Sequence, residues 1–398
     1  MTGPSVFFYV QHLLGIGHLA RASRIARALV DRGMQVTLVT GGLPVPGFPG
    51  SDIPHLALPP VAVRDGGFKG LVDADGQPAD TAYLDARKTI LLDAFHRLKP
   101  DIVMIEAFPF GRKQVRFELL PLIDAIEATR PRPRLVTSLR DILQRRGRPD
   151  RDQETVDLVR RHFDLVLVHG DRAFPALGDS FPFADQITDK VVYTGLVCPP
   201  PPPPPVERFE ILVSAGGGAV GKELVHAAMG AAARLPDLSP WCVISGPNLP
   251  QAEFDKLTMI APSNVTLVRF RTDLASLMSG ARLSVSQAGY NTVGDILQAG
   301  CRALVVPYTA QGETEQADRA ERLERIGRVS VLQGADLTSD ALADAIGRAL
   351  ARPLSPDALR IAVDGAARSA QILHMSTCPG PSGADAAGRA GVPVGTRR

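Results

Sequence analysis

The stretch SQAGYNTVGDILQAGCRALVVPYTAQGETEQADRAERL, residues 286–323, alternates short apolar runs with amphipathic segments. The pattern predicts a strand end, a glycine turn, a helix that opens at Asn291 or Thr292, a strand that ends at Pro307, and a second helix. Strand, turn and helix in this order form the repeating unit of a parallel α/β sheet. The segment therefore predicts an α/β fold.

The same rhythm fills both halves of the chain, and an uninterrupted proline run at 199–205 separates them. Neither a helix nor a central strand can continue through such a run. We therefore expect two Rossmann-like parallel-sheet domains that face each other across a cleft. The expected parts are an N-terminal domain at 1–198, a polyproline linker at 199–205, a C-terminal domain at 206–375 and a disordered tail at 376–398.

Composition excludes several classes of protein. The chain has 398 residues, a net charge of +2, 45% hydrophobic and 22% charged residues, which is typical of a globular enzyme and gives no reason to expect a nucleic-acid partner. The four cysteines are far apart and predict neither a zinc site nor a disulfide framework. No secretion signal or membrane-spanning run is evident, so we expect a cytoplasmic protein, and leave open peripheral contact with the inner face of the membrane.

A glycine-rich loop follows the first predicted strand of each half. Gly15 and Gly17 belong to the first loop, and the second holds Gly216, Gly217 and Gly218. A loop between a strand and the start of a helix exposes backbone amides and the positive end of the helix dipole, which attract an anion. Both loops are therefore candidate contacts for phosphate or carboxylate groups.

Neither loop fits a standard nucleotide cofactor. In the second loop Lys222 is followed by Glu223, where a triphosphate-binding loop needs a Ser or Thr hydroxyl for magnesium. The second predicted strand of each half lacks the terminal acid that would bind the ribose of a nicotinamide or flavin cofactor. An oxidoreductase is therefore disfavoured, and we expect no cofactor and no metal.

The quoted segment carries a candidate site for a nucleotide diphosphate. Amides at Gly289 can contact phosphates, Asn291 and Thr292 can donate further hydrogen bonds, and Asp295, one turn along the helix, can accept from ribose hydroxyls. The next helix carries Glu315 and Gln316, which could contact a sugar. Each residue alone has a structural alternative, such as a helix cap, and only the joint spacing favours a binding site.

The run QAGYNTVGD, 287–295, resembles the donor box of the UDP-sugar glycosyltransferases of the GT-B type, which reads His-Cys-Gly-Trp-Asn-Ser-x-x-Glu. The resemblance covers most of residues 5–350 and implies that Gly289, Asn291 and Thr292 bind phosphates and Asp295 the ribose. It also implies that Glu315 and Gln316 touch sugar hydroxyls. Two positions depart from the pattern, since Gln287 replaces a phosphate-binding His and Asp295 is shorter than Glu.

The layout also resembles the bacterial transferases that add N-acetylglucosamine to the lipid-linked peptidoglycan precursor. Their interdomain strand is similar to YTGLV, 193–197, and their uracil-side loop to FRTDL, 270–274, which implies that Phe270 and Arg271 lie near the donor base. Their first glycine loop also carries a histidine at the position of His18. The denser glycine run of that family is missing here, so the same acceptor is not implied.

His18 is the candidate general base. In such a fold a neutral imidazole after Gly15 and Gly17 would face the acceptor and take the proton of the attacking hydroxyl. Glu106 and Asp141 both stand near the ends of predicted strands, and either could orient the imidazole. Amides of the Gly216–Gly218 loop and Thr292 would stabilise the departing diphosphate, without a metal. The structural alternative is that His18 only buttresses the first helix.

The sequence favours a metal-independent, inverting glycosyltransferase that moves a sugar from a nucleotide diphosphate sugar, expected to be a UDP-sugar, to an acceptor hydroxyl. The acceptor could be a glycan, a lipid-linked group or a small molecule. A nucleotide-sugar hydrolase is the first alternative, because GIGHLAR also resembles the hydrolase of pseudaminic acid synthesis. A non-catalytic nucleotide-sugar-binding subunit is the second. The sugar, the base and the acceptor are not fixed by the sequence.

Overall fold

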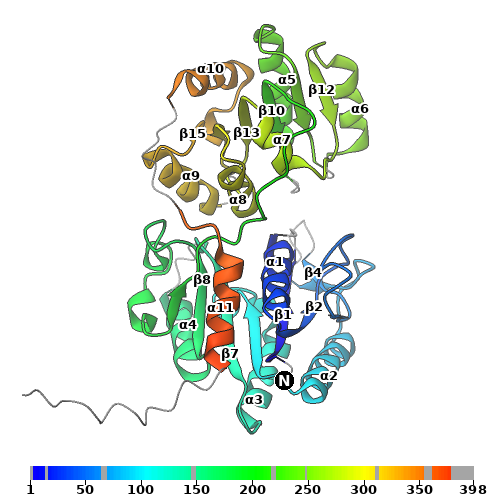
Figure 1. The fold of residues 1–398 in the computed structure, drawn as a ribbon. Coiled ribbons are helices and arrows are strands. Elements are labelled where there is room, and N and C mark those ends of the chain that lie inside the picture. The colour runs from blue at the N-terminus through cyan, green and yellow to red at the C-terminus, as the bar shows by residue number, and fades with distance from the viewer. Residues whose placement is uncertain are drawn as a thin grey trace, which may run out of the picture.

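The computed structural model describes residues 3–13, 17–63, 70–144, 149–216, 221–246, 249–309, 313–353 and 361–377. The chain forms two α/β domains, one above the other in Figure 1. Each is built on a parallel sheet, so the predicted fold class is confirmed.

The N-terminal domain has a seven-stranded parallel sheet in the order β3-β2-β1-β6-β7-β8-β9. Its strands are β1 (Ser5–Val10), β2 (Gln35–Thr40), β3 (His55–Ala57), β6 (Ile102–Glu106), β7 (Arg134–Arg140), β8 (Leu165–His169) and β9 (Val191–Tyr193). The helices are α1 (Gly17–Asp31), α2 (Thr81–Leu98), α3 (Arg116–Ala128) and α4 (Pro149–His162), with short 3-10 turns η1 (Lys113–Val115), η2 (Leu177–Asp179) and η3 (Ala184–Ile187). A small antiparallel pair, β4 (Ala62–Val63) and β5 (Leu71–Val72), lies outside the sheet.

The C-terminal domain has a six-stranded parallel sheet in the order β12-β11-β10-β13-β14-β15. Its strands are β10 (Ile211–Ser214), β11 (Trp241–Ile244), β12 (Val265–Val268), β13 (Leu283–Ser286), β14 (Ala303–Val305) and β15 (Ser330–Val331). The helices are α5 (Lys222–Arg234), α6 (Gln251–Ile260), α7 (Leu274–Gly280), α8 (Tyr290–Ala299), α9 (Glu315–Arg325) and α10 (Ser339–Ala351), with the 3-10 turn η5 (Gly334–Asp336).

Both sheets are buried on two faces. Successive side chains of a strand point to opposite sides, and each side packs into its own apolar cluster. In β1, Phe7 and Tyr9 join one apolar cluster, whereas Val6, Phe8 and Val10 join the cluster under α1. β10 shows the same alternation, with Ile211 and Val213 on one side and Leu212 on the other. The near-continuous apolar runs of the sequence are therefore strands buried on both faces.

The last helix, α11 (Gly365–Thr377), returns to the N-terminal domain and packs beside α1 (Figure 1). Ala370 and Leu373 of α11 are fully buried in the apolar cluster that includes Ile25 and Leu29 of α1. The predicted C-terminal domain at 206–375 contains this helix, so the structure differs from that boundary. The predicted tail at 376–398 overlaps α11 at Ser376 and Thr377, and its remainder lies outside the described residues.

The chain crosses between the domains twice, and the two crossings pair with each other. The amide of Leu196 donates to the carbonyl of Ala362, and the amide of Gly365 donates to the carbonyl of Leu196. Gly195 adopts a φ of +84°, and a Cβ there would lie 2.9 Å from the Cβ of Ala362. Glycine is therefore required at this position by both the backbone conformation and the close approach.

The predicted linker at 199–205 lies against the C-terminal domain. Gln298 of α8 donates to the carbonyl of Pro199 at 2.7 Å, and Ser276 of α7 donates to the carbonyl of Pro203 at 2.8 Å. Prolines have no amide hydrogen, so their carbonyls are the groups that can be held in this way. The segment is fixed to one domain along its length.

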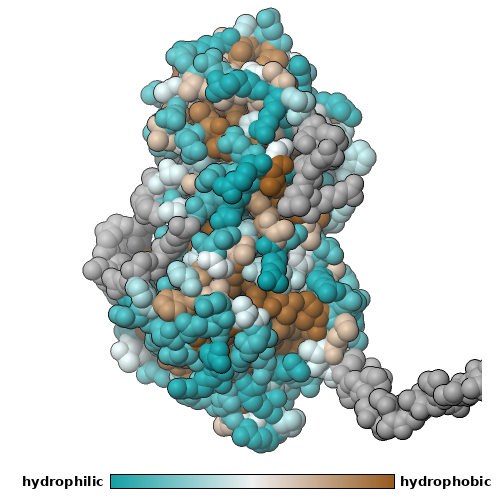
Figure 2. All heavy atoms as spheres, turned by 90° about the vertical axis from the view of Figure 1, so that its left-hand side faces the viewer, coloured by the Kyte–Doolittle hydropathy of each residue, from teal (hydrophilic) through white to brown (hydrophobic). Residues whose placement is uncertain are grey.

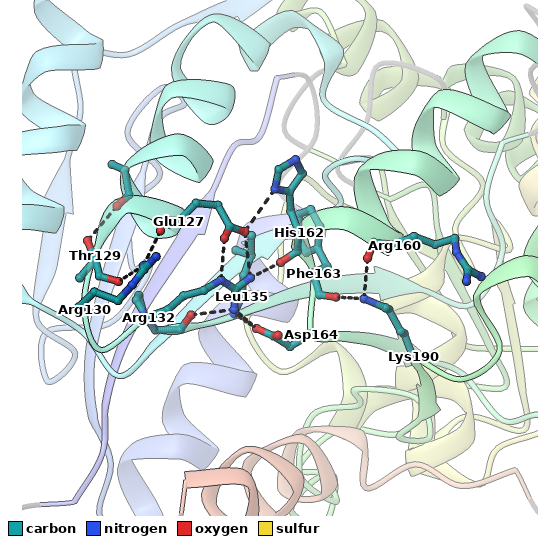
Figure 3. Close-up of polar contacts among 12 residues, drawn as sticks. Glu127, Thr129, Arg130, Arg132, Leu135, Arg160, His162, Phe163, Asp164 and Lys190 are labelled. Atoms are coloured by element: carbon teal, nitrogen blue, oxygen red, sulfur yellow. Dashed lines mark hydrogen bonds and ion pairs between the residues drawn. The ribbon is translucent and has the colours of Figure 1, made fainter.

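The amino-terminal edge of the first sheet is held by ion pairs and helix-end contacts, shown in Figure 3. Arg132 pairs with Glu127 at 3.1 Å and with Asp164 at 2.8 Å, which joins the end of α3 to the start of β8. Lys190 donates to the carbonyls of Arg160 and Phe163 at the end of α4, which have no partner within the helix. These contacts stabilise the edge opposite to the one where ligands bind in open α/β sheets.

On the face shown in Figure 2, hydrophilic residues cover most of both domains and apolar residues gather in separate patches. Within the described ranges, no helix is long and apolar enough to cross a bilayer. Cys198, Cys242 and Cys301 are buried free thiols, and Cys378 lies outside the described residues.

A buried ion pair lies under the loops that follow β1 and β2. Arg87 of α2 and Glu118 of α3 are both fully buried and pair at 2.7 Å. Arg87 also donates to the carbonyl of Gly41 at 2.8 Å and to the side chain of Gln11 at 2.7 Å. Because Arg87 contacts both loops, it fixes the backbone next to the first glycine loop.

We predict that Arg87→Met lowers the free energy of unfolding by about 3–5 kcal/mol, because it leaves the Glu118 carboxylate buried without its cation. Urea unfolding followed by circular dichroism measures this change. The matched control is Lys88→Met, since neighbouring Lys88 pairs with Asp85 at 2.7 Å on the surface, where such pairs contribute about 0–1 kcal/mol. Equal losses in the two variants would contradict the role of the buried pair.

Candidate active site

His18 and Glu106 meet at the carboxyl-terminal edge of the first sheet. His18 is in the first turn of α1, Glu106 is the last residue of β6, and His18 Nδ1 lies 2.9 Å from Glu106 Oε1. An ionised carboxylate can only accept, so Nδ1 carries the proton and Nε2 keeps its lone pair. The imidazole is 18% exposed whereas Glu106 is fully buried, so a base with a fixed tautomer borders solvent.

Glu106 stays ionised although it is buried. Burial by itself raises its pKa, but the charge of Arg21 and the hydrogen bond from His18 hold the pKa of Glu106 well below its usual range. Ser138 of β7 also donates to Glu106 Oε2 at 2.5 Å. The carboxylate can therefore orient the imidazole and stabilise the imidazolium that forms when His18 takes a proton.

A chain of hydrogen bonds connects Glu106, through Ser138, to buried side chains of the first sheet. His169 Nε2 lies 2.8 Å from Ser138 Oγ, and His169 Nδ1 lies 2.9 Å from Thr194 Oγ1. Burial, followed by the charge of Arg21, lowers the pKa of His169 to about 3. This histidine is therefore a neutral structural group that holds Ser138 in place.

His18 is also neutral in this structure. Burial, followed by the charge of Arg112, lowers its pKa to about 3. Arg21 forms an ion pair with Glu106 and is 2% exposed. The side chain of Arg21, which would be read from sequence as a solvated helix charge, is therefore part of the buried site.

Asp141, the other candidate partner of His18, lies elsewhere in the interface. Its carboxylate binds Arg319 of α9 through two hydrogen bonds of 2.8 and 2.7 Å, and both side chains are fully buried. Because Arg319 comes from the C-terminal domain, this pair joins the two domains. The structure brings Glu106 to His18 and leaves Asp141 to hold the domains together.

Tyr290, the first residue of α8, contacts both domains. The Cζ atoms of Arg21 and Arg319 lie 5.1 and 5.8 Å from the centroid of its ring. The hydroxyl donates to the carbonyl of His169 at 3.0 Å and accepts from the amide of Val197 at 2.8 Å. The start of α8 is thereby anchored to β8, to the crossing at Val197 and to Arg21, which pairs with Glu106.

Several predicted donor residues gather around the start of α8. Gly289 is its N-cap residue, Thr292 lies in its first turn, and a Cβ on Gly216 would lie 3.7 Å from the Gln287 amide oxygen. The amide oxygen of Gln316 accepts from the amides of Ala288 and Tyr308 at 3.1 and 3.2 Å, which ties α9 to this turn. Gly15, Gly217 and Gly218 lie outside the described residues.

Three further predicted donor residues interact with arginines of the N-terminal domain. Arg24 of α1 donates to Asn291 Oδ1 at 3.1 Å, and a Cβ on Gly17 would lie 3.3 Å from Asn291 Nδ2. Burial, opposed by the charge of Arg24, raises the pKa of Asp295 to about 6. Glu315 pairs with Arg319 at 2.7 Å and also with Arg140 of β7. The sugar-binding role expected of Glu315 would require displacing these cations.

Phe270 and Arg271 follow β12, the edge strand of the second sheet, two strands from β10. Phe270 is 66% exposed, and Arg271 pairs with Asp273 at 2.7 Å and with Glu207 at 3.0 Å. Within the part of the chain that the structure describes, no hydrogen bond or ion pair joins either residue to the turn at Gly289, so their expected position near a donor base rests on the resemblance alone. Among the described residues, no group of three or more His, Cys, Asp or Glu side chains could hold a metal ion.

Sequence reasoning did not find the arginines that organise the interface. The pair Glu315–Arg319 has the i, i+4 spacing of a helical ion pair, so that contact had a signal in the sequence. The hydrogen bond from Arg319 to Asp141 joins residues 178 positions apart, and no pattern in the sequence indicated it. Tyr290 stands at the Trp position of the motif that resembles a donor box, but its contacts with Arg21 and Arg319 depend on how the two domains are arranged.

We predict that Asp141→Asn loosens the two domains and raises the radius of gyration measured by small-angle X-ray scattering. The substitution removes the charge that faces the fully buried Arg319 guanidinium. The matched control is Arg322→Gln, because Arg322 and Asp179 form another pair between the domains, at 2.9 Å, whose side chains are 25% and 42% exposed. A control variant that opened as far as Asp141→Asn would contradict the assignment.

Comparison with known proteins places these features in a family context. Residues 212–371 match the glycosyltransferase family 28 C-terminal domain. The chain is 24% identical over 185 residues to the UDP-N-acetylglucosamine--N-acetylmuramyl-(pentapeptide) pyrophosphoryl-undecaprenol N-acetylglucosamine transferase of Thermotoga neapolitana, a match to 46% of this chain and 52% of that protein. The enzyme of the same name from Burkholderia mallei is 37% identical over 82 residues, 21% of this chain and 22% of that protein. The chain thus spans about half of the first relative and about a fifth of the second.

Solved structures match over both domains. CalG4, the calicheamicin glycosyltransferase, aligns with a TM-score of 0.59 at 18% identity, over 94% of this chain and 95% of its own. MurG of Acinetobacter baumannii aligns with a TM-score of 0.57 at 18% identity, over 94% and 99%. The spinosyn rhamnosyltransferase SpnG aligns with a TM-score of 0.57 at 16% identity, over 94% and 95%. The chain therefore has the two-domain GT-B fold, and its C-terminal half resembles the glycosyltransferases of family 28.

Proposed function

We propose that this protein is a glycosyltransferase that moves a sugar from a nucleotide diphosphate sugar to a hydroxyl group of an acceptor. The observation that carries the proposal is the position of the His18–Glu106 pair against the start of α8. Gly17 of the His18 turn reaches Asn291 of the donor box, and Arg21 of the same helix contacts Tyr290. These contacts support a base from the first domain and an anion-binding helix start from the second that act at one place.

The proposed chemistry follows from these groups. The acceptor oxygen forms a bond to the anomeric carbon, the bond from that carbon to the diphosphate breaks with its electron pair, and His18 Nε2 takes the acceptor proton. Glu106 stabilises the imidazolium, and amides at the start of α8, with the Thr292 hydroxyl, stabilise the leaving diphosphate. Attack from the side opposite the diphosphate inverts the anomeric carbon, and no metal takes part in this scheme.

The names of the relatives favour a UDP-sugar as the donor, since the transferases of Thermotoga and Burkholderia use UDP-N-acetylglucosamine. Those proteins act on a lipid-linked acceptor, whereas the structurally similar CalG4 belongs to calicheamicin glycosylation. We therefore propose a UDP-sugar donor, and an acceptor that is either lipid-linked, with the protein at the cytoplasmic face of a membrane, or a small molecule.

We predict that UDP raises the melting temperature of the protein more than GDP or TDP does. A ligand that binds only the folded state stabilises it by about 2.7 kcal/mol when its concentration is one hundred times the dissociation constant.

We predict that Thr292→Val raises the dissociation constant for UDP about tenfold. The Thr292 hydroxyl makes no hydrogen bond within the described part of the chain, so it is available to a ligand. Thr258→Val on the exposed face of α6 is the control. If no nucleoside diphosphate stabilised the protein, the donor assignment would fail.

We predict that His18→Ala lowers turnover at least about a hundredfold and leaves nucleotide binding unchanged, because His18 acts on the acceptor. Transfer from labelled UDP-sugars to an acceptor panel measures turnover, and calorimetry measures binding. His96→Ala on the surface of α2 is the control. Full activity of His18→Ala would remove the base from the mechanism, and rapid release of free sugar without any acceptor would identify a hydrolase.

A further inference from the structure

Arg112 is a partly buried cation beside the proposed base, and it has no ion-pair partner within the described ranges. It follows β6 in the loop that begins at Glu106, and its φ of +60° is in the left-handed region that few residues other than glycine adopt. Its Nε atom is buried and has no hydrogen-bond partner, and no ion pair is formed by Arg112 within the described ranges. The loop therefore holds a guanidinium group in the site at a cost in backbone strain.

The carboxylates of the ion-pair network next to Arg112 all have other partners. Arg112 is acted on by the charges of Glu106, Arg21 and Arg140, and the ion pair of Arg140 extends the network to Glu315, Arg319 and Asp141. With Arg112 the network holds four guanidinium groups and three carboxylates. Each carboxylate has an arginine partner: Glu106 pairs with Arg21, Asp141 with Arg319, and Glu315 with Arg140 and Arg319. Arg112 is the positive charge left over.

The surroundings penalise the charge of Arg112. Burial, followed by the positive charges of Arg140 and Arg21, lowers its pKa to about 10, against the attraction of Glu106. Glu106 cannot relieve this, because its oxygens are already bound by Arg21, His18 and Ser138. An anion that reaches the partly buried guanidinium would compensate this charge and could bind the unpaired Nε.

We propose that Arg112 binds an anionic group of the acceptor, a phosphate or a carboxylate, and so places the acceptor hydroxyl next to His18. This inference rests on the proposed function, because it assigns the acceptor side of the same site. A guanidinium group is suited to both anions, since its donors match two oxygens at once.

Acceptor binding would then also strengthen the base. The charged groups that act on His18 are Arg112 from the loop after β6, Glu106 from β6 and Arg21 from its own helix. Arg112 is the largest charge effect that lowers the pKa of His18. An anion on Arg112 opposes that effect, so the pKa of His18 rises towards the range in which an imidazole is an efficient base. Water carries no such group, which favours transfer over hydrolysis.

The test follows the imidazole of His18 by NMR in the full-length protein, with the signal assigned from its loss in His18→Gln. Methyl phosphate and acetate serve as probes, and the one that shifts the titration at lower concentration identifies the anion. In the unsubstituted protein we expect the pKa of His18 to rise as the probe saturates. In Arg112→Gln it should already be raised without a probe, and probe binding should weaken at least about tenfold.

Arg112→Lys keeps the positive charge, so in this variant the probe should still raise the pKa of His18, by a smaller amount than in the unsubstituted protein. Arg325→Gln is the control, because Arg325 is an exposed residue at the end of α9 that pairs with Glu321. The inference is overturned if neither probe shifts His18, or if the shift is the same in Arg112→Gln. Stabilisation by UDP is measured on the same samples. If UDP still stabilises the protein while the probes give one of these two results, only the role of Arg112 is wrong. If UDP stabilises none of the samples, the proposed function itself is wrong.

Discussion

The fully buried bond between Arg319 and Asp141 is the interaction on which the candidate site depends. Neither domain alone contains a complete site, because the proposed base comes from the first sheet and the donor box from the second. Removing two charges from water is unfavourable unless they meet with good geometry, and here the guanidinium donates to both carboxylate oxygens. The pair therefore favours the one arrangement of the domains in which Tyr290 contacts both Arg21 and Arg319.

The His18 site depends in turn on that arrangement. Arg21 holds Glu106 ionised, and Tyr290 covers Arg21, so the tautomer of His18 is coupled to the position of the other domain. In this structure Arg24 and Arg140 bind Asn291 and Glu315, two residues expected to contact a donor. An incoming nucleotide sugar would exchange these contacts for its own, which links donor binding to the interface.

The fold was largely predictable from the sequence because it depends on local signals. The proline run, the strand–turn–helix rhythm and the run QAGYNTVGD each identify their elements within a few residues. The site was predictable in part: His18 and the start of α8 follow from their positions at the ends of strands. The choice between Glu106 and Asp141 was not predictable, since both end strands of one sheet and only side-chain geometry separates them. Arg112 was missed because a lone arginine in a loop has no pattern, and its significance arises from the balance of surrounding charges.

The return of α11 to the first sheet has a consequence for how the chain is made. The apolar face of α1 that receives Ala370 and Leu373 is translated long before its covering helix, and the whole second domain is synthesised in between. Domains usually fold in order of synthesis, the N-terminal one first. Here α1 lacks its covering helix until α11 has been synthesised, so this apolar face of the first domain can be completed only after the second domain has been translated.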